Sequence, residues 1–331
     1  MMCPEERSEK MKNTLPACTD KLTILVNSCD AYEDLWMPCF TLLKRYWPDP
    51  DTAIVLNTET KQYRMDGLHI DCANFPEGDS YGARIRNALK HIHTEYVLLM
   101  LDDFFLRQMV RMEEICQIIS WMDADSEIVC FNSEAMDLYT ELDNRSYPGY
   151  RRVPPGNDYS LNMQAAIWRV EALKKYWEPD SSPWEWEEFS SALTGVYLSD
   201  KIYCRAEDKP PFIDYGHYRT GDLWAVVAGK WILEDVEPLF RREGISVDFS
   251  IRGEYVPECS NGRFTQNMSR RDKFQFISRC LGKKLAVMHL FFCIDCKLRL
   301  LFGKEVNDDF LSFLKQRGKS FVAKIQQNQK Q

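Results

Sequence analysis

The feature of the sequence that most constrains the fold is a short apolar run, Tyr96 to Leu101, that ends on two adjacent carboxylates, Asp102 and Asp103. Such a run predicts a strand buried on both faces, usually in the middle of a parallel sheet. The acids then lie at the carboxyl end of the strand, where open α/β sheets bind ligands. There they could hold a hard divalent cation and, through it, a phosphate. The alternative is a turn whose carboxylates cap a helix predicted around Val110 to Trp121.

Strands and helices alternate on both sides of this run. Residues 22–26 are apolar and β-branched and lead into a polar turn, Asn27 to Asp30, which predicts the opening of a βαβ unit. The next helix places Trp36, Cys39, Phe40 and Leu43 on one face, with Pro38 near its first turn. We therefore expect an α/β fold. The other expected strands are 53–56, 68–70, 127–131, 196–198 and 201–204, with 247–253 closing the domain and 137–159 forming a long binding loop.

The composition indicates a globular chain. Its 331 residues are 45% hydrophobic, which is ample for one large α/β domain. No run approaches the roughly 18 apolar residues of a membrane-spanning helix, and residues 1–21 predict a flexible polar arm without a secretion signal. The cytoplasm is thus the expected location. The 12 cysteines are scattered, and several lie in apolar segments, which favours reduced core thiols over a disulfide framework: Cys39, Cys116, Cys130 and Cys204.

The charge is unevenly spread along the chain. Residues 261–331 hold 15 Lys and Arg against 5 Asp and Glu, although the whole chain has a net charge of −8. This segment predicts a basic helical extension. Its apolar stretch 285–294 is flanked by basic residues, so region 270–304 could make a peripheral contact with the inner face of a membrane. Packing against the preceding domain is the alternative. No nucleic-acid partner is expected.

A second informative block is Ser182-Pro183-Trp184-Glu185-Trp186-Glu187-Glu188, which predicts a helix with Pro183 at its first position. A carboxylate between aromatic side chains can have its pKa raised toward neutrality and can accept a proton from a hydroxyl group. The tryptophans could also stack on a sugar ring. The alternative is an acidic first turn that complements the helix dipole, with the tryptophans in the core.

The order of these motifs resembles the nucleotide-sugar glycosyltransferases with the GT-A fold, and in particular bacterial enzymes of surface-polysaccharide assembly. The resemblance covers roughly residues 22–255. It depends on the Asp30 turn, on Arg84 before the central strand with Asp102-Asp103, on the segment 164–169, and on the block with Glu185 and Glu187. It implies a GT-A-like, Rossmann-type mixed sheet flanked by helices over residues 22–260, followed by a C-terminal helical extension over 261–331.

The resemblance also implies roles for individual residues. The nucleotide would be held by the polar turn and the central strand, through Asn27, Asp30, Arg84 and Asp102. Asp103, with His217 as a further ligand, would bind Mg²⁺ or Mn²⁺ on the donor diphosphate. Glu187, with Glu185 as its nearest rival, would be the base that deprotonates the acceptor.

The implied function is transfer of a sugar from a nucleotide-sugar donor to a hydroxyl of a saccharide or lipid-linked acceptor, with inversion at the anomeric carbon. A cation and Arg84 would stabilise the departing diphosphate in the transition state. The segment is Asp-Asp-Phe and lacks a second spaced carboxylate, which leaves open whether a metal is required. A non-catalytic nucleotide- or carbohydrate-binding protein on the same fold is the alternative.

Overall fold

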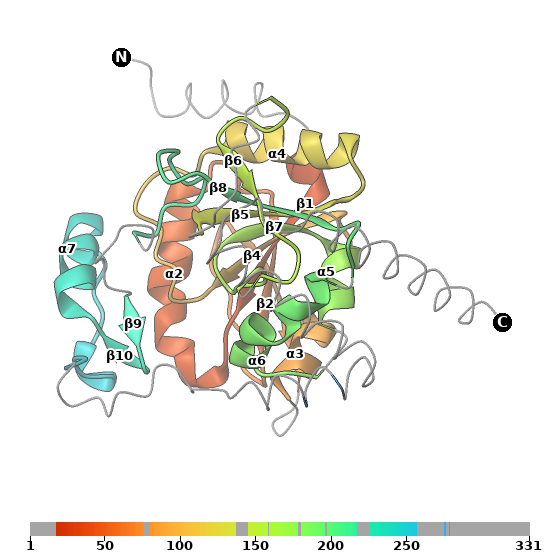
Figure 1. The fold of residues 1–331 in the computed structure, drawn as a ribbon. Coiled ribbons are helices and arrows are strands. Elements are labelled where there is room, and N and C mark those ends of the chain that lie inside the picture. Colours follow the sequence, from red (N-terminus) through yellow and green to blue (C-terminus); the bar gives the residue numbers. More distant parts are fainter. Residues whose placement is uncertain are drawn as a thin grey trace, which may run out of the picture.

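The computed structural model describes residues 18–75, 80–136, 145–157, 159–177, 180–195, 197–216 and 225–256, together with residues 275 and 278. Its centre is an eight-stranded sheet with the order β3-β2-β1-β4-β7-β5-β8-β6 (Figure 1). The described residues do not include His217 or residues 1–17 of the predicted arm. They also leave out the predicted extension, apart from residues 275 and 278. The strands are β1 (Leu22–Asn27), β2 (Ala53–Thr58), β3 (His69–Asn74), β4 (Tyr96–Leu101), β5 (Ile128–Ala135), β6 (Tyr150–Arg152), β7 (Ala166–Arg169) and β8 (Lys201–Arg205).

The sheet is mixed, which confirms the predicted fold class. β1 pairs in parallel with β2 and β4, β2 with β3, and β5 with β8. β7 is antiparallel to both β4 and β5, and β6 is antiparallel to β8. The predicted central strand β4 is therefore central and buried, but it has a parallel neighbour on one side only. As a consequence, the start of β7 meets the ends of β4 and β5 at one edge.

Helices cover both faces of the sheet (Figure 1). On one face, apolar side chains of α2 (Glu33–Tyr46), α4 (Met112–Ala124) and α7 (Leu233–Glu243) pack in one core cluster. On the other face, α3 (Tyr81–Ala88), α5 (Val170–Tyr176) and α6 (Pro183–Glu188) contribute to a second cluster. The predicted stripe of α2 is buried, although Pro38 lies inside the helix rather than in its first turn. Both layers follow from amphipathic helices burying their apolar faces.

A smaller unit packs beside α2, and Figure 1 shows it in cyan at the edge of the molecule. It contains the antiparallel pair β9 (Val226–Val227) and β10 (Lys230–Trp231), α7, and the 3-10 helix η4 (Phe249–Ile251). Trp231 joins the unit to the main core, since its ring lies 6.1 Å from that of Phe105. The Tyr46 hydroxyl donates to Glu243 of α7 at 2.6 Å. The region 247–253, which is expected to close the domain, contains η4.

Two expectations about local structure were wrong. Tyr197 and Leu198 lie in a bend and a turn after the 3-10 helix η3 (Ser190–Gly195), where a strand was expected. Cys116 is not a reduced thiol, because it forms a disulfide with Cys18, with the two Cα atoms 5.4 Å apart. The partner of Cys116 lies in the segment expected to be a flexible arm, so composition gave no sign of it. Cys39, Cys130 and Cys204 are free and buried, as expected.

Within the described residues, no helix is both long enough and apolar enough to span a membrane. The region 270–304, for which a membrane contact is predicted, lies outside them apart from residues 275 and 278.

Candidate active site

The carboxyl ends of β1, β2, β4 and β5 meet the start of β7 at one edge of the sheet. Four of the eight predicted site residues end or follow these strands: Asn27, Asp30, Asp102 and Asp103. Asn27 ends β1, Asp102 and Asp103 follow β4, and Glu187 lies on α6 on the adjacent face. This edge is where α/β sheets bind their ligands.

Asp102 is held in place by side chains of the first βα unit. Its exposed fraction is 4%. Ser28 Oγ donates to Asp102 Oδ2 at 2.5 Å, and Trp36 Nε1 donates to Ser28 Oγ at 2.6 Å. Burial and the neighbouring charge of Asp103 raise the pKa of Asp102 well above its usual value. The helix α2 therefore fixes the orientation of Asp102 through a serine and a tryptophan.

Asp103 lies beside it with less support. Its Oδ1 atom is buried, and no described residue donates a hydrogen bond to it. Burial raises the pKa of Asp103 to about 6, while the charge of Arg252 lowers it. A buried carboxylate oxygen without a donor is unfavourable unless a ligand completes it.

Asp103 is suited to be one ligand of a hard divalent cation. Mg²⁺ is usually bound by one or two carboxylates together with substrate phosphates and water. Asp103 Oδ1 offers one such ligand. Among the described residues, no group of three His, Cys, Asp or Glu side chains forms a complete metal site. Phosphate oxygens of a bound ligand and water could complete the coordination of a cation held by Asp103.

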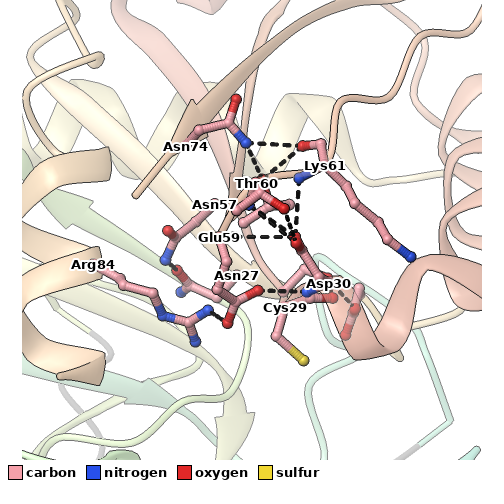
Figure 2. Close-up of polar contacts among 12 residues, drawn as sticks. Asn27, Cys29, Asp30, Asn57, Glu59, Thr60, Lys61, Asn74 and Arg84 are labelled. Carbon is pink, nitrogen blue, oxygen red and sulfur yellow. Dashed lines mark hydrogen bonds and ion pairs between the residues drawn. The ribbon is translucent and has the colours of Figure 1, made fainter. Parts of the chain in front are cut away.

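Asp30 organises the loop after β2 (Figure 2). Its carboxylate accepts the backbone N–H groups of Glu59, Thr60 and Lys61 at 3.1 to 3.2 Å, as well as the Thr60 hydroxyl at 2.5 Å. These hydrogen bonds outweigh burial and lower the pKa of Asp30. Asp30, which is predicted to bind the nucleotide, thus accepts hydrogen bonds from the backbone of the protein itself in this structure.

Arg84 points into the same network (Figure 2). Its guanidinium forms an ion pair with Glu59, whose other oxygen accepts the backbone N–H of Asp30. Both side chains are largely buried, with exposed fractions of 10% and 17%. Arg84 therefore connects α3 to the loop after β2.

Asn27 and Asn57 lie side by side at the ends of β1 and β2. Asn57 Nδ2 donates to Asn27 Oδ1 at 3.1 Å. Asn27 Nδ2 and Asn57 Oδ1 are buried and have no hydrogen-bond partner among the described residues. One donor and one acceptor are thus left at the strand ends beside Arg84 and Asp30.

Arg252 brings the small unit to this edge. Its Nε and Nη2 atoms donate to the two oxygens of Asp34 at 2.7 and 2.5 Å, and its guanidinium lies 4.2 Å from the centre of the Tyr32 ring. It also donates to the carbonyl oxygen of Ala31 at 3.0 Å. Its charge lowers the pKa of both Asp102 and Asp103. Nothing in its sequence context singles out this arginine, because Asp34 and Ala31 lie more than 200 residues away along the chain.

Glu187 reaches the same cluster from α6. Its Oε1 atom accepts the backbone N–H of Met163 at 2.8 Å. The pKa of Tyr81 is raised first by burial and then by Asp102, Glu187, Cys29 and Asp103, which places these charges around one hydroxyl group. Glu187 and the two aspartates therefore lie within electrostatic range of the same hydroxyl group.

The other residues of the α6 motif, Glu185, Trp186 and Trp184, each have a different environment. Glu185 belongs to a capping box, in which its carboxylate accepts the Ser182 N–H at 2.9 Å. Trp186 is buried and stacks on Trp177 with ring centres 4.5 Å apart. Trp184 is 55% exposed and is the tryptophan on α6 that a ligand could contact.

Sequence reasoning missed a third carboxylate at this edge, Glu134 near the end of β5. Its exposed fraction is 5%, and burial raises its pKa to about 7. A weak signal was available, because Glu134 comes three residues after the predicted apolar strand 127–131. Tyr215 and Gln164, which lie nearby, carry no such signal, since a loop and an antiparallel strand bring them there.

No protein-family model matches this chain, and no curated protein matches it either. Similar solved structures include TarS of S. aureus, with 14% identity, a TM-score of 0.39, and coverage of 80% of this chain and 43% of TarS. IspDF of Campylobacter jejuni has 14% identity, a TM-score of 0.33, and coverage of 56% and 49%. This chain thus spans less than half the length of either. The mannosyltransferase PcManGT of Pyrobaculum calidifontis, in complex with GDP-Man and Mn²⁺, has 10% identity, a TM-score of 0.38, and coverage of 92% and 86%.

Glycosyltransferases are thus among the solved structures that this chain resembles, together with cytidylyltransferases. The TM-scores of TarS, IspDF and PcManGT all lie below 0.5, so the function of this chain has to be argued from its own residues.

Proposed function

We propose that this protein is a glycosyltransferase that moves a sugar from a nucleotide-sugar donor to a hydroxyl group of a saccharide or lipid-linked acceptor. One observation supports this most directly. The buried Asp102 and the half-buried Asp103 follow β4 at the predicted ligand-binding edge of the sheet, and Asp103 Oδ1 is buried with no donor among the described residues. Such an oxygen is suited to a cation that bridges to a diphosphate.

The donor nucleotide would lie across the ends of β1, β2 and β4. Asn27 and Asn57 present an unpartnered donor and acceptor there, and Asp30 and Arg84 shape the neighbouring loop. Asp102, fixed by Ser28, would accept a ribose hydroxyl. These residues would orient the donor so that its diphosphate lies at Asp103.

Mg²⁺ or Mn²⁺, held by Asp103, would neutralise charge on the diphosphate as it leaves. His217, the other predicted ligand, lies outside the described residues. Because Arg84 is paired with Glu59, stabilisation of the leaving group by Arg84 requires that this ion pair open or be shared. Tyr81 would exclude water from the buried carboxylates.

Glu187 is the proposed base on the acceptor side. Its hydrogen bond to Met163 N–H fixes the carboxylate on the α6 side of the aspartate pair. Attack from that side, opposite the leaving diphosphate, would invert the anomeric carbon. Glu185 is the second candidate from the sequence, and its carboxylate would have to leave the capping box to act.

A panel of nucleotide sugars tests this proposal, with thermal unfolding recorded with and without Mn²⁺. A ligand that binds only the folded state raises the melting temperature, so we expect one or more donors to do so, and more strongly with Mn²⁺. Donor consumption is then measured. Binding without consumption at any acceptor concentration would instead support a non-catalytic binding protein.

Glu187→Gln sharpens the test of the base. The change keeps the shape of the side chain but removes its negative charge, so donor affinity should be unchanged while transfer falls by about 10² or more. Glu171→Gln, on the exposed face of α5, is the matched control and should match the wild type. Unchanged transfer in Glu187→Gln would move the base to another residue.

A further inference from the structure

The two tryptophans of α6 differ in what surrounds them. Trp186 is buried, its ring stacks on that of Trp177, and its Nε1 atom donates to the carbonyl oxygen of Tyr176 at 3.1 Å. Trp184 is 55% exposed, although its indole ring is the largest apolar side chain that a protein can leave in contact with water. Packing of the core therefore accounts for Trp186 and not for Trp184.

The helix that carries Trp184 is held firmly against its neighbours. It begins with a capping box and a proline at its first position. The chain before it lies against α3, where a Cβ atom on Gly82 would come within 2.9 Å of Asp180 Oδ1, closer than Cβ atoms normally approach. Arg86 of α3 donates to the carbonyl oxygen of Trp177 at 3.0 Å. The backbone of Trp184 is thus fixed, which lowers the entropic cost of binding a ligand on its ring.

Trp184 lies on the same face of α6 as Glu187. The two residues are three positions apart on one helix, a spacing that places their Cβ atoms about 5 to 6 Å from each other. Glu187 is half-buried, and its Oε1 atom accepts the N–H of Met163 just before β7. A pyranose ring is of similar width. A ring that lies on Trp184 would therefore present a hydroxyl group to Glu187.

The chemistry around Trp184 suits a saccharide. Asp180, whose side chain is 58% exposed, and Glu187 flank Trp184 along the chain, so an apolar ring is combined with acceptors of hydrogen bonds. A saccharide has C–H groups on the face of its ring, which carry slight positive charge and match the negative face of an indole. Its hydroxyl groups can donate to carboxylates. An anionic lipid surface would be repelled by the same acids.

We propose that the acceptor saccharide stacks on Trp184 and thereby brings one of its hydroxyl groups to Glu187. This inference rests on the proposed function and adds the chemical class of the acceptor, a sugar ring with an apolar face of C–H groups. Trp184 binds and orients this ring and takes no part in proton transfer. It therefore supports the ground state and the transition state alike.

The first test separates the acceptor from the donor in the rate of sugar transfer. Methyl glycosides and disaccharides, cellobiose among them, serve as acceptors, with Mn²⁺ and the most active donor. Trp184→Ala should raise the acceptor KM by about tenfold or more and leave kcat and the donor KM nearly unchanged, because only binding of the acceptor is lost. Trp184→Phe keeps an aromatic ring and should recover most of the acceptor affinity.

Leu198→Ala is the matched control. Leu198 is 47% exposed and precedes β8, which runs parallel to β5 and begins at the opposite edge of the sheet. It should behave as the wild type. Because Trp184 and Leu198 are both exposed, neither replacement should change the melting temperature much, and thermal unfolding of each variant checks this.

Saturation-transfer NMR with the same saccharides, recorded without donor, gives a readout that does not depend on turnover. The ring C–H protons of a bound saccharide should receive saturation from the wild type and from Trp184→Phe. They should receive much less from Trp184→Ala. Sedimentation with vesicles of phosphatidylglycerol and phosphatidylcholine is measured in parallel.

The outcomes separate this inference from the proposed function. A higher acceptor KM together with lost saturation transfer in Trp184→Ala alone supports stacking of the acceptor. An unchanged acceptor KM in Trp184→Ala overturns it while transfer still stands, and a higher donor KM alone or a loss of vesicle binding alone would assign the ring to the donor or to a membrane. Saccharide binding through Trp184 without donor consumption overturns the proposed function and leaves Trp184 in a carbohydrate-binding site. A wild-type protein that binds none of the saccharides overturns the inference, whatever it does with the donor.

Discussion

Two regions of one sheet edge use their carboxylates differently. At the ends of β1 and β2, Asp30 accepts three backbone N–H groups, and Glu59 pairs with Arg84, so both acids are satisfied by the protein itself (Figure 2). At the ends of β4 and β5, the atoms Asp103 Oδ1 and Glu134 Oε1 are buried, and neither has a donor among the described residues. We therefore propose that the acids of the first region hold the loop after β2 in place and that those of the second take part in the reaction.

The pKa values follow the same division. Hydrogen bonds lower the pKa of Asp30, whereas burial raises the pKa of Asp103 to about 6 and that of Glu134 to about 7. A raised carboxyl pKa means that ionisation opposes folding. Carboxyl groups with raised pKa values cluster at functional sites, which supports our proposal that the ends of β4 and β5 form the reacting side.

The largest effect should come from Asp103→Asn. The amide is nearly the same size but is a weak ligand for a hard cation, so transfer with saturating Mn²⁺ should fall by about 10³. Because the buried charge is removed, the melting temperature at pH 8 should stay the same or rise. Donor consumption and thermal unfolding on one preparation check both. If Asp103→Asn keeps both sugar transfer and its stimulation by Mn²⁺, Asp103 does not bind the cation and the assignment of β4 to the reacting side is wrong.

The next largest effect should appear in the pH dependence of stability. Between the unfolded pKa of Glu134, near 4.5, and its folded pKa of about 7, the folded state binds more protons than the unfolded state. The free energy of unfolding should therefore fall as pH rises through this window, by about 3 kcal/mol for this group. Asp103 acts in the same direction up to about pH 6.

Urea unfolding at pH 5 and pH 8 measures this directly. The loss of stability from pH 5 to pH 8 should be smaller in Glu134→Gln than in the wild type. Glu243 provides an internal contrast, because its pKa is lowered to about 2 and its stabilising contribution is already complete above pH 4.5. Equal slopes in wild type and Glu134→Gln would mean that Glu134 is ionised throughout.

The sequence predicted the parts of this edge that depend on local patterns. The apolar run of β4 and the two aspartates after it could be recognised, because an apolar stretch followed directly by charged residues is a local pattern in the sequence. The mixed sheet was expected, yet the place of β7 between β4 and β5 was not, because strand order depends on contacts between distant segments. Glu134 was missed, because Asn132 and Ser133 separate it from the predicted apolar strand 127–131, whereas Asp102 follows its apolar run directly.

Roles that depend on long-range partners were beyond prediction. Arg252 meets Asp34 across 218 residues, and Arg84 meets Glu59 from another element. A charged residue in a sequence gives no sign of whether a partner will satisfy it. Asp30 and Asp103 therefore looked alike as ligand candidates, and only the fold shows that the backbone of 59–61 already surrounds Asp30.

A smaller effect should follow from Asp30→Ala. The loop after β2 would lose the acceptor for three N–H groups, so the free energy of unfolding should fall by about 2 kcal/mol. Donor affinity should fall as well, because the loop borders the predicted nucleotide site, while the pH dependence of stability between 5 and 8 stays as in the wild type. Urea unfolding checks the first effect. If Asp30→Ala instead raised stability, the hydrogen bonds to Asp30 would not compensate its burial. Asp30 would then resemble Asp103, and the two regions would not differ.

The smallest expected effect concerns the Arg84–Glu59 pair, which is best measured by a double-mutant cycle. Arg84→Met alone leaves a largely buried carboxylate without its cation, and Glu59→Gln alone leaves a largely buried guanidinium, so each should lower stability by about 2 kcal/mol. The double variant should recover most of this loss, because neither charge then remains unpaired. A coupling energy of about 1 kcal/mol or more supports a structural role for the pair. The contrary result would be a coupling energy near zero without the nucleotide-sugar donor, together with loss of donor affinity in Arg84→Met. Arg84 would then bind the ligand, and α3 would belong to the reacting region.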